Sequence, residues 1–450
     1  MKYEDYKDSG MSWIGQVPTQ WKRSRLKFLF SHSNAGVWGE EEKGDENDIA
    51  CFRVADFDYQ KGYLGFDKLT MRNITAKELD GRLLTEGSLL IEKSGGGDAT
   101  PVGRVVRFNY EDKATCSNFV HFVTVDESHN SDFLYYYFYA MYANKENLLY
   151  FNQTTGIQNL KIGEYLGQSI FIPTFEEQQA ITSYLDKKCG KINGAIDVQK
   201  KKIDLLNELK QTIITNAVTK GLNPDVPRKD SGVEWIGQVP AHWEVRKIKN
   251  ICKSEKYSVK TGPFGTQLKG QELQPDGDVR VYNQRNVIDD QFSDTQFYVS
   301  NNKAKELESF FTKPLDLLVT SRGTIGRCSI LPEDKPMGIL HPCLIALRIN
   351  TQICDINWAK IFINDSSCFA TNIFLNSNAT TIEVIYTDTL KNIVIPIPPV
   401  TEQEIIVAHI KEEVSKIDAQ IAKANRRIEL LNELKQSVIT EAVTGKIKVC

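Results

Sequence analysis

The chain has 450 residues, which is too long for a single hydrophobic core, so we expect at least two domains. Its hydrophobic content of 41% and charged content of 25% are typical of soluble globular proteins, and no apolar run reaches the length of a membrane span. The formal net charge of −3 neither indicates nor excludes nucleic-acid binding, because acidic surface can offset local basic faces. The nine scattered cysteines never form Cys-x-x-Cys, which predicts free thiols in a reducing cytoplasm.

A repeated strap precedes each half of the chain. Residues 7–27 return at residues 229–249, an offset of 222 residues, and both copies contain Trp-Ile-Gly-Gln-Val-Pro. A second tryptophan follows in each copy, Trp21 and Trp243. We predict an apolar segment that docks on another element. The basic residues behind it either face phosphate or are simply solvated, and the pattern does not choose between these alternatives.

Each strap leads into a region of short β-rich runs, one helical stretch and a closing strand. In the first region the strands are predicted at residues 51–57, 88–91, 104–108 and 119–125, the helix at 133–139 and the closing strand at 168–173. In the second region the corresponding ranges are 279–283, 316–320, 327–331 and 343–349, then 358–374 and 393–397. Both regions are therefore predicted to be mixed α/β domains with little side-chain identity between them.

A long amphipathic segment closes each half. The string Leu-Leu-Asn-Glu-Leu-Lys-Gln occurs at residues 205–211 and again at 430–436, an offset of 225 residues. Around it, apolar residues recur in the three- and four-residue steps of one helical face, and this face includes Leu209 and Leu434. A narrow apolar seam on so long a helix needs a partner helix, so we expect the two segments to pair as an antiparallel coiled coil. The alternative is that each helix packs on its own globular neighbour.

The predicted seam contains equivalent positions from both helices. The predicted interface residues are Ile192, Ile196, Ile203, Leu206, Ile213, Ile417, Ile421, Ile428, Leu431 and Val438. The second strap follows the first helix directly, so by repeat logic the first strap should lie against the end of the second helix. The two chain termini should then be adjacent.

These elements define the predicted organisation. The first globular domain with its strap spans residues 1–175, the first spacer helix 176–220, the second strap and domain 221–398, and the second spacer helix 399–445. The fold class is mixed α/β, with two pseudo-two-fold-related globular domains separated by two long antiparallel coiled-coil helices.

One glycine-containing loop in each domain combines backbone freedom with basic and hydroxyl side chains. Each loop follows an apolar strand and ends in Gly-Arg before the next strand. Glycines allow a ligand to approach the backbone closely, and Lys, Arg and hydroxyl groups suit phosphates or base edges. The candidate contacts here are Lys93, Ser94, Gly95 and Arg104 in the first domain, and Ser321, Arg322, Gly323, Thr324 and Arg327 in the second.

Further polar segments precede the closing strands. Asn and Gln can pair bidentately with adenine, whereas Arg and Lys suit guanine. The candidates are Gln153, Thr154, Thr155 and Gln158 in the first domain, and Asn283, Arg285, Thr380 and Thr381 in the second. Polar segments of this kind are exposed to solvent without a ligand about as often as they bind one.

Enzyme motifs are missing from the sequence. It contains no Walker phosphate loop, no His-Glu-x-x-His helix and no Gly-x-Ser-x-Gly elbow. The six histidines do not combine with cysteines at zinc-site spacing, and the tetrapeptide expected of an amino-methyltransferase is not found. We therefore predict no catalytic residues and no metal site.

Together, the straps, loops and paired helices resemble the specificity subunits of type I restriction-modification systems. The resemblance covers nearly the whole chain. The motifs that carry it are the Trp-Ile-Gly-Gln-Val-Pro strap, the Pro-x-x-x-Glu-Gln entry to each helix (Pro173 to Gln178, Pro398 to Gln403) and the Leu-Leu-Asn-Glu-Leu-Lys-Gln core. Each motif is modest alone, but two copies in the same order are specific.

The resemblance implies a cytoplasmic, non-catalytic subunit that binds double-stranded DNA, with each target-recognition domain reading one half of a bipartite, asymmetric target. It also implies partners, namely modification (methyltransferase) subunits, expected to be two, and restriction (translocase/nuclease) subunits that join through the complex. The chain itself is expected to bind no cofactor, whereas the partners would bind S-adenosylmethionine, ATP and Mg²⁺. The rival interpretations are a standalone DNA methyltransferase or nuclease, and a coiled-coil scaffold protein that does not touch DNA.

Two hypotheses follow from this resemblance. If the helices set the distance between half-sites, lengthening both by one turn should widen the gap without changing either half-site sequence; a changed sequence with an unchanged gap would contradict this. If Arg322 and Lys93 touch bases, alanine at either should relax one half-site only, by about 1–3 kcal/mol. If they touch phosphates, binding to all sequences should weaken alike.

Overall fold

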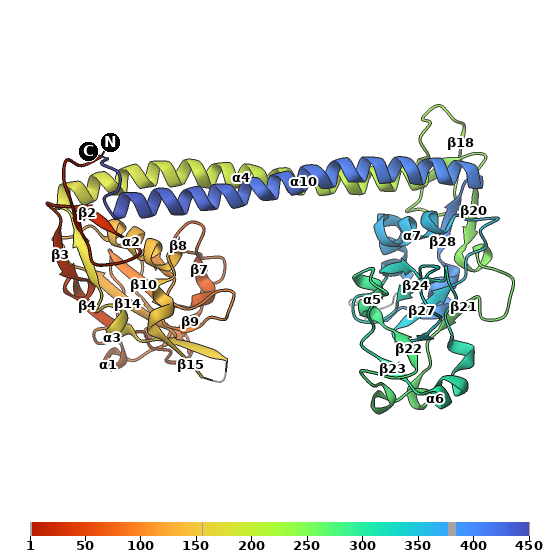
Figure 1. Cartoon of the computed structure of the whole chain (residues 1–450), viewed down its shortest axis with the longest axis horizontal. Coiled ribbons are helices and arrows are strands. Elements are labelled where there is room, and N and C mark those ends of the chain that lie inside the picture. Colours follow the sequence, from red (N-terminus) through yellow and green to blue (C-terminus); the bar gives the residue numbers. More distant parts are fainter. Residues whose placement is uncertain (1, 155, 377–383, 450) are drawn as a thin grey trace. The chain divides into compact units, whose positions relative to one another are not determined.

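The computed structural model describes residues 2–154, 156–376 and 384–449. The chain divides into two units (Figure 1), the first made of Met1–Lys201 with Ala424–Cys450 and the second of Lys202–Lys423. Each unit contains one globular region together with part of each long helix. A mixed α/β fold with two similar regions and two long helices was predicted from the repeats, and this prediction is confirmed.

A six-stranded sheet forms the centre of the first unit. In spatial order its strands are β4 (Phe30–Ala35), β14 (Val120–Val125), β10 (Ser88–Glu92), β12 (Val105–Arg107), β8 (Tyr63–Leu64) and β7 (Phe57–Asp58). Neighbouring strands are antiparallel, except that β12 and β8 are parallel. Every residue of β10 is buried, as its continuous apolar run predicts for a central strand.

A second, smaller sheet carries the only other parallel strand pair among the described residues of this unit. Its strands are β13 (Ala114–Cys116), β6 (Asp48–Phe52), β9 (Met71–Asn73) and β5 (Glu40–Glu41), with β13 parallel to β6. The predicted strand at 51–57 is wrong beyond Phe52, because residues 54–56 form a 3₁₀ turn. The Asp56 carboxylate stabilises this turn by accepting from the Arg53 backbone N–H over 2.7 Å and from its guanidinium over 2.9 Å.

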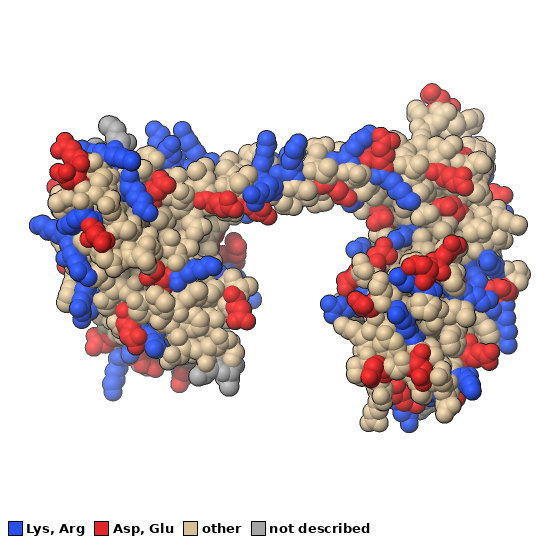
Figure 2. All heavy atoms as spheres, viewed as in Figure 1, with Lys and Arg blue, Asp and Glu red and all other residues tan. Residues whose placement is uncertain are grey.

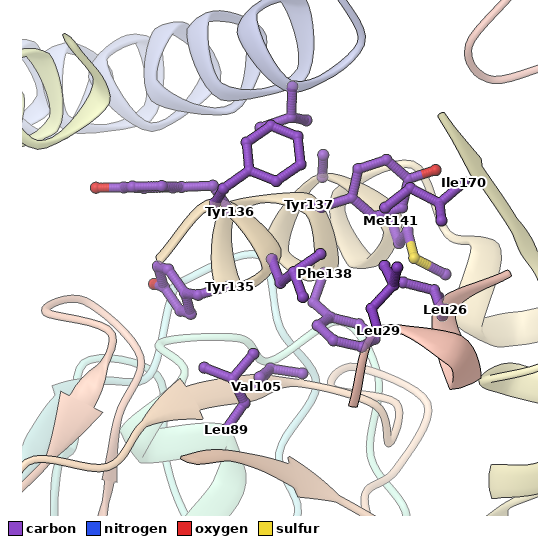
Figure 3. Close-up of a cluster of buried hydrophobic side chains, with 14 of the residues drawn as sticks. Leu26, Leu29, Leu89, Val105, Tyr135, Tyr136, Tyr137, Phe138, Met141 and Ile170 are labelled. Carbon is purple, nitrogen blue, oxygen red and sulfur yellow. The ribbon is translucent and has the colours of Figure 1, made fainter. Parts of the chain in front are cut away.

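The aromatic helix α2 (Ser131–Ala143) is buried on two sides, which explains its unbroken run of aromatic residues. Tyr135 lies on the sheet side with the Arg107 guanidinium 4.3 Å from its ring, near Leu89 of the sheet (Figure 3). Tyr136 points the other way and donates its hydroxyl hydrogen to Asp186 Oδ1 of helix α4 (Phe175–Lys220) over 2.7 Å. Helix α2 thus ties the sheet to the long helix within the first unit.

The second unit repeats the same strand plan. Its main sheet runs β21 (Val259–Thr261), β27 (Leu344–Leu347), β24 (Leu317–Thr320) and β25 (Cys328–Ile330), all antiparallel. Its smaller sheet is β23 (Tyr298–Val299), β22 (Val279–Tyr282) and β26 (Ile339–Leu340), with β22 and β26 parallel. These strands correspond in order and direction to β4-β14-β10-β12 and to β9-β6-β13, so residues can be matched between units despite their different side chains.

One predicted helix of the second unit is two helices. Residues 358–374 were expected to be continuous, but α7 (Ile356–Asp365) and α8 (Ser367–Asn376) are separated at Ser366. The Ser366 hydroxyl donates to the Phe362 carbonyl oxygen over 2.6 Å and accepts from the Phe369 N–H over 3.4 Å. A serine that bonds the backbone locally competes with the helix, so it permits the break.

Each strap forms a short hairpin that docks at the start of a long helix. The hairpins are β1 (Tyr6–Asp8) with β2 (Gln16–Pro18), and β18 (Arg228–Asp230) with β19 (Gln238–Pro240). Behind them the buried Trp21 donates its indole N–H to Glu177 Oε1 over 3.2 Å, and Trp243 donates to Glu402 Oε1 over 3.1 Å. The glutamate of the repeated Glu-Gln motif therefore anchors the strap tryptophan in both units.

The glutamine of the same motif anchors the short helix of each domain. Gln178 accepts from the Asn130 backbone N–H over 2.8 Å, and Gln403 accepts from the Asp355 backbone N–H over 2.7 Å. Asn130 and Asp355 are the N-cap residues of α2 and α7, where a side-chain oxygen satisfies free N–H groups. The motif thus links the long helix, the strap and the domain helix in each unit.

The closing strands also pair with the straps. Strand β3 (Lys22–Arg25) is antiparallel to β17 (Ser169–Ile172), and β20 (Glu244–Lys247) is antiparallel to β28 (Val394–Ile397). The end of the second long helix also reaches the first strap, because a Cβ on Gly445 would collide with Pro18 and crowd Trp21. The predicted contact between the first strap and the end of the second helix is confirmed.

In each unit the two long helices run antiparallel. In the first unit the early residues Ile181 and Leu185 of α4 share a core with the late residues Ile439 and Ala442 of α10 (Val400–Val443). In the second unit the late residues of α4 pack with the early residues of α10. Those residues are Ile214, Ala217 and Val218 with Ile406, Val407 and Ile410. The predicted antiparallel pairing is confirmed in both.

A pair of equivalent polar contacts crosses between the helices. The Lys435 ammonium donates to Asn193 Oδ1 over 3.0 Å in the first unit, and Lys210 donates to Asp418 Oδ1 over 2.8 Å in the second. Lys210 and Lys435 are the lysines of the repeated seven-residue string, and Asn193 and Asp418 are also 225 residues apart. Polar groups at such positions specify helix register, because a shifted register would leave them without partners.

The predicted helical face includes two residues that do not belong to a buried seam. Each of the ten predicted interface residues is buried or partly buried. In contrast, Leu209 and Leu434 are 47% and 50% exposed, while Lys435, which follows Leu434 in the chain, is buried. An apolar face built from steps of three and four residues rotates slowly around the helix axis along its length. At the leucine-rich string this rotation places the two leucines on the side away from the partner helix.

Candidate nucleic-acid interface

In the first unit, the glycine-rich loop after β10 lies beside a polar hairpin. The three strands involved are β11 (Ser94–Gly95), β16 (Ile157–Leu160) and β15 (Phe151–Thr154). Ser94 pairs with Asn159, and its hydroxyl also donates to Asn159 Oδ1 over 2.7 Å. Two polar segments that are separate in the sequence are thereby brought into one sheet.

The predicted contact residues of this loop and hairpin differ in exposure. Gln153 is exposed and Lys93 is partly buried, with the Lys93 backbone N–H donating to the Phe119 carbonyl oxygen over 3.0 Å. Ser94 is buried. Gln158 is also buried, and its Oε1 accepts from the Val102 N–H over 3.2 Å. The Gln158 side chain therefore holds the glycine loop in place, and its contact with DNA stays a prediction.

Arg104 closes the base of the loop. Its Nε donates to Glu92 Oε2 over 2.8 Å and one Nη donates to Oε1 over 3.3 Å, so the fork of the guanidinium binds a carboxylate that is 1% exposed. The guanidinium also lies 3.7 Å from the ring centre of Tyr59. A buried carboxylate needs such a partner. Arg104 therefore has a structural role, and its contact with DNA stays a prediction. Thr155 lies outside the described residues.

A pocket of about 460 Å³ opens beside this loop. Its lining includes Gly95, Gly96, Arg53 and two exposed aromatic residues, Trp38 and Phe119. Sequence reasoning missed Trp38 and Phe119 because it looked for polar side chains, and it also did not select Arg53. An aromatic residue next to glycine at a strand end could have identified Trp38, since exposed rings are platforms for bases.

The first unit should lose stability in acid because of His121 in β14. Burial first, and then the Lys93 charge, lower the pKa of His121 from 6.5 to about 4, and its Nε2 lies 2.9 Å from Ser33 Oγ. The unfolded chain therefore binds more protons than the folded unit between these pKa values, so stability falls as pH falls from about 6.5 towards 4. Urea unfolding of His121→Gln at pH 7 and pH 5 should show a smaller pH dependence than the unchanged chain. Identical pH dependence would contradict this assignment.

In the second unit, the corresponding loop joins β24 to β25 and is closed by Thr320. The Arg327 N–H donates to Thr320 Oγ1 over 2.9 Å, and the Gly326 N–H donates to the Thr320 carbonyl oxygen over 2.9 Å. Between them Arg322, Gly323 and Thr324 are exposed, as is Arg327. Ser321 is buried, and its contact with DNA stays a prediction.

The other predicted residues of the second unit divide in the same way. Asn283 is buried and caps helix α5 (Gln284–Ile288), accepting from the Arg285 N–H over 2.8 Å, and its contact with DNA stays a prediction. Arg285 is exposed and pairs with Asp289 over 3.2 Å, one turn along its helix. Thr380 and Thr381 lie outside the described residues.

Two residues that sequence reasoning did not select lie against the second loop. Gln284 donates through Nε2 to the Thr324 carbonyl oxygen over 3.4 Å. The exposed ring of Phe264 lies beneath Arg322, whose guanidinium carbon is 5.5 Å from the ring centre. Among the described residues, none forms a hydrogen bond or ion pair with the Arg322 side chain, which lies over the Phe264 ring.

Charge and metal ligands add little to these loops. On the face seen in Figure 2, basic and acidic side chains are interspersed rather than gathered into one basic field. Within residues 2–154, 156–376 and 384–449, no group of three or more His, Cys, Asp or Glu side chains could hold a metal ion. Among the same residues, no helix is long and apolar enough to cross a membrane.

Comparison with known proteins identifies similar chains. The family model of the type I restriction modification DNA specificity domain matches twice, at residues 18–210 and 240–432. The chain is 24% identical over 446 residues to the type I restriction enzyme MjaVIII specificity subunit of Methanocaldococcus jannaschii, covering 96% of this chain and 94% of that one. It is 23% identical over 316 residues to the EcoKI specificity subunit of Escherichia coli, covering 68% and 63%.

A solved structure shares the fold. It comes from work on the complex assembly and conformational transition of the type I R-M system, with a TM-score of 0.69 at 13% identity. The match covers 96% of this chain and 99% of that one. At this identity the likeness concerns the fold alone, and it extends over the whole arrangement of two domains and two long helices.

Proposed function

Because the chain belongs to the type I restriction modification DNA specificity family, we propose that each unit reads one half of a bipartite, asymmetric DNA target. The observation that carries this proposal is that matching sheets present different loops. At the same point of the strand plan, the first unit has Ser94 and Gly95 beside a polar hairpin, whereas the second has Arg322 and Thr324 beside Gln284. Equivalent positions with different donors suit two unlike half-sites.

The chain is proposed to be the DNA-reading, non-catalytic part of a complex. Modification subunits, two in number, and restriction subunits would supply the chemistry. S-adenosylmethionine, ATP and Mg²⁺ would be bound by those partners. The eight described cysteines are free, which supports a reducing cytoplasm.

The exposed leucines of the repeated string support docking of the modification subunits. Leu205 and Leu209 are 57% and 47% exposed in the second unit, and Leu430 and Leu434 are 47% and 50% exposed in the first. Leucines four residues apart on one helix form an apolar strip that suits a partner helix. The strip occurs twice at equivalent positions, so two copies of one partner would find the same surface.

The continuous helices are proposed to set the gap between half-sites. Helix α4 has 46 residues and α10 has 44, and neither is interrupted. For two readers on one face of DNA, the gap should be near one helical turn, about 34 Å.

Methylation mapping tests the proposed function. Cells that express the chain with its modification subunits should carry methylated adenines in a single motif with two unlike halves and a fixed gap. The purified chain alone should retain a duplex that contains this motif but neither methylate nor cut it. Turnover by the chain alone with S-adenosylmethionine or Mg²⁺ would show that it is an enzyme, and loss of every sequence preference would show that it is a scaffold.

A further inference from the structure

The same short loop follows the first strand of the main sheet in both units. Strand β4 is followed by Gly36-Val37-Trp38-Gly39, and the equivalent strand β21 by Gly262-Pro263-Phe264-Gly265. The pattern Gly-x-aromatic-Gly therefore recurs at matched positions, although the two domains otherwise share few side chains. We call each copy the aromatic loop.

The glycines give both aromatic loops one shape. A Cβ on Gly36 would collide with the carbonyl oxygens of Cys116 and Ser117, and a Cβ on Gly262 would collide with that of His341. Gly39 and Gly265 have φ angles of 61° and 56°, which side chains rarely adopt. The loop is thus built against the strand ends of the smaller sheet in both units.

This shape leaves the aromatic ring at the surface. Trp38 is 37% exposed and Phe264 is 47% exposed. Exposing a large apolar ring forfeits the stabilisation that burial would give. A ring held outward at the same place in both units, next to the candidate reading loop of each, is therefore explained by a ligand better than by the core.

An arginine lies over each ring, but it comes from a different element in each unit. The Arg72 guanidinium, from β9, is 4.5 Å from the Trp38 ring centre, and that of Arg322, from the loop after β24, is 5.5 Å from Phe264. The Nε and one Nη of Arg72 donate to the carbonyl oxygens of Trp38 and Gly39 over 3.0 and 3.1 Å. Arg72 thus fixes its loop, whereas the donors of Arg322 are not used by any described residue.

We propose that the aromatic residue of each aromatic loop determines specificity at the same point of its half-site, by positioning an arginine in the second unit and by contacting DNA directly in the first. In the second unit, Phe264 orients Arg322 so that its forked donors meet the O6/N7 edge of a guanine. In the first unit, the donors of Arg72 are used by backbone carbonyl oxygens. There, Trp38 presents its own ring to a base or to the methyl group of thymine. This inference rests on the proposed function and assigns base-reading positions within it.

The test uses the full chain assembled with its modification subunits and a duplex library in which each half-site is varied in turn. Phe264→Ala should reduce discrimination at one base pair of one half-site by about tenfold or more. Phe264→Tyr should keep that discrimination, and Phe264→Leu should lose it, because only an aromatic face holds the guanidinium. Trp38→Ala should relax the other half-site alone. Arg322→Ala combined with Phe264→Ala should lose no more than Arg322→Ala does.

Matched controls exist in both units. Phe28 is 68% exposed with the Lys27 ammonium 5.1 Å from its ring centre, and Tyr257 is 46% exposed with Lys256 4.8 Å away. Both lie outside the aromatic loops, so Phe28→Ala and Tyr257→Ala should leave both half-sites unchanged. Unchanged discrimination in Phe264→Ala and Trp38→Ala, or an equal loss of binding to every duplex, would overturn the inference. If the unchanged complex selects no bipartite motif at all, it is the proposed function that fails.

Discussion

Replacing Trp243 by alanine should lower the free energy of unfolding of the second unit by about 3–5 kcal/mol. Trp243 is fully buried, its ring meets that of Trp358 edge to face with centroids 5.8 Å apart, and its indole N–H is bonded to Glu402. A large cavity would therefore open where the strap meets the start of α10. The close approach of Gly221 to the indole shows that the end of α4 would lose the same support.

Denaturant unfolding followed by hydrogen exchange would locate this loss. Peptides from Lys202–Lys423 should become less protected in Trp243→Ala, and those of the first unit should not. Trp21→Ala is the matched variant, in which peptides of the first unit should become less protected and those of the second unit should not. Trp243→Phe keeps most of the buried area but removes the N–H donor, so it should cost clearly less. A variant in which both units respond equally would contradict separate anchoring by the two straps.

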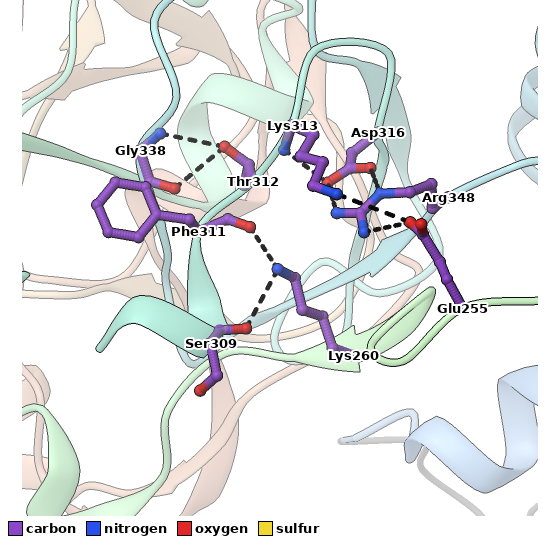
Figure 4. Close-up of polar contacts among 9 residues, drawn as sticks. All are labelled: Glu255, Lys260, Ser309, Phe311, Thr312, Lys313, Asp316, Gly338 and Arg348. Carbon is purple, nitrogen blue, oxygen red and sulfur yellow. Dashed lines mark hydrogen bonds and ion pairs between the residues drawn. The ribbon is translucent and has the colours of Figure 1, made fainter. Parts of the chain in front are cut away.

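Replacing Asp316 by alanine should destabilise the second unit by a similar amount, about 3–5 kcal/mol, by leaving a buried cation without its partner. Arg348 Nε donates to Asp316 Oδ1 over 2.9 Å and one Nη donates to Oδ2 over 3.1 Å (Figure 4). Asp316 is 1% exposed and Arg348 is 7% exposed. Glu255, which accepts from the other Nη over 2.7 Å, is much more exposed and would compensate little.

A double variant distinguishes the effect of the unpaired charge from the effect of the lost side-chain volume. Asp316→Leu with Arg348→Met removes both charges, so it should be less destabilised than Asp316→Ala alone. Calorimetry of the three chains would measure the difference. Because Asp316 immediately precedes β24, Asp316→Ala should also weaken DNA binding through the second half-site. Equal unfolding free energies for the single and double variants would show that the uncompensated charge is not the cause.

The repeated organisation of domain and long helix could be predicted from the sequence, because the patterns that indicate it are either local or present in two copies. Apolar steps of three and four residues identify a helix face without any knowledge of its partner, and the second copy showed which features recur. The strap tryptophans and the Glu-Gln motif were identified as repeats, although their shared contact was not. Glu177 and Trp21 are far apart in the chain, so only the folded unit shows that one binds the other.

The structural contacts of the candidate reading residues could not be predicted from the sequence, for a physical reason. Gln158, Asn283 and Arg104 have the side chains that DNA contacts require, but the same donors and acceptors also satisfy loops, helix caps and buried carboxylates. Which use prevails depends on neighbours that arrive from other strands. Arg322 also follows a strand in a glycine-containing loop, but it stays exposed because no acidic residue of the described chain reaches it.

By itself, the sequence determined that the protein is written twice, that each half pairs a mixed domain with a long helix, and that the helices run antiparallel. These properties follow from composition, spacing and repetition, which exist before folding. Only the tertiary structure decided that Lys435 and not Leu434 faces the partner helix, and that Trp38 and Phe264 occupy equivalent exposed positions. Exposure and hydrogen-bond partnership are set by strand pairing between distant segments, so they become defined only when the chain has folded.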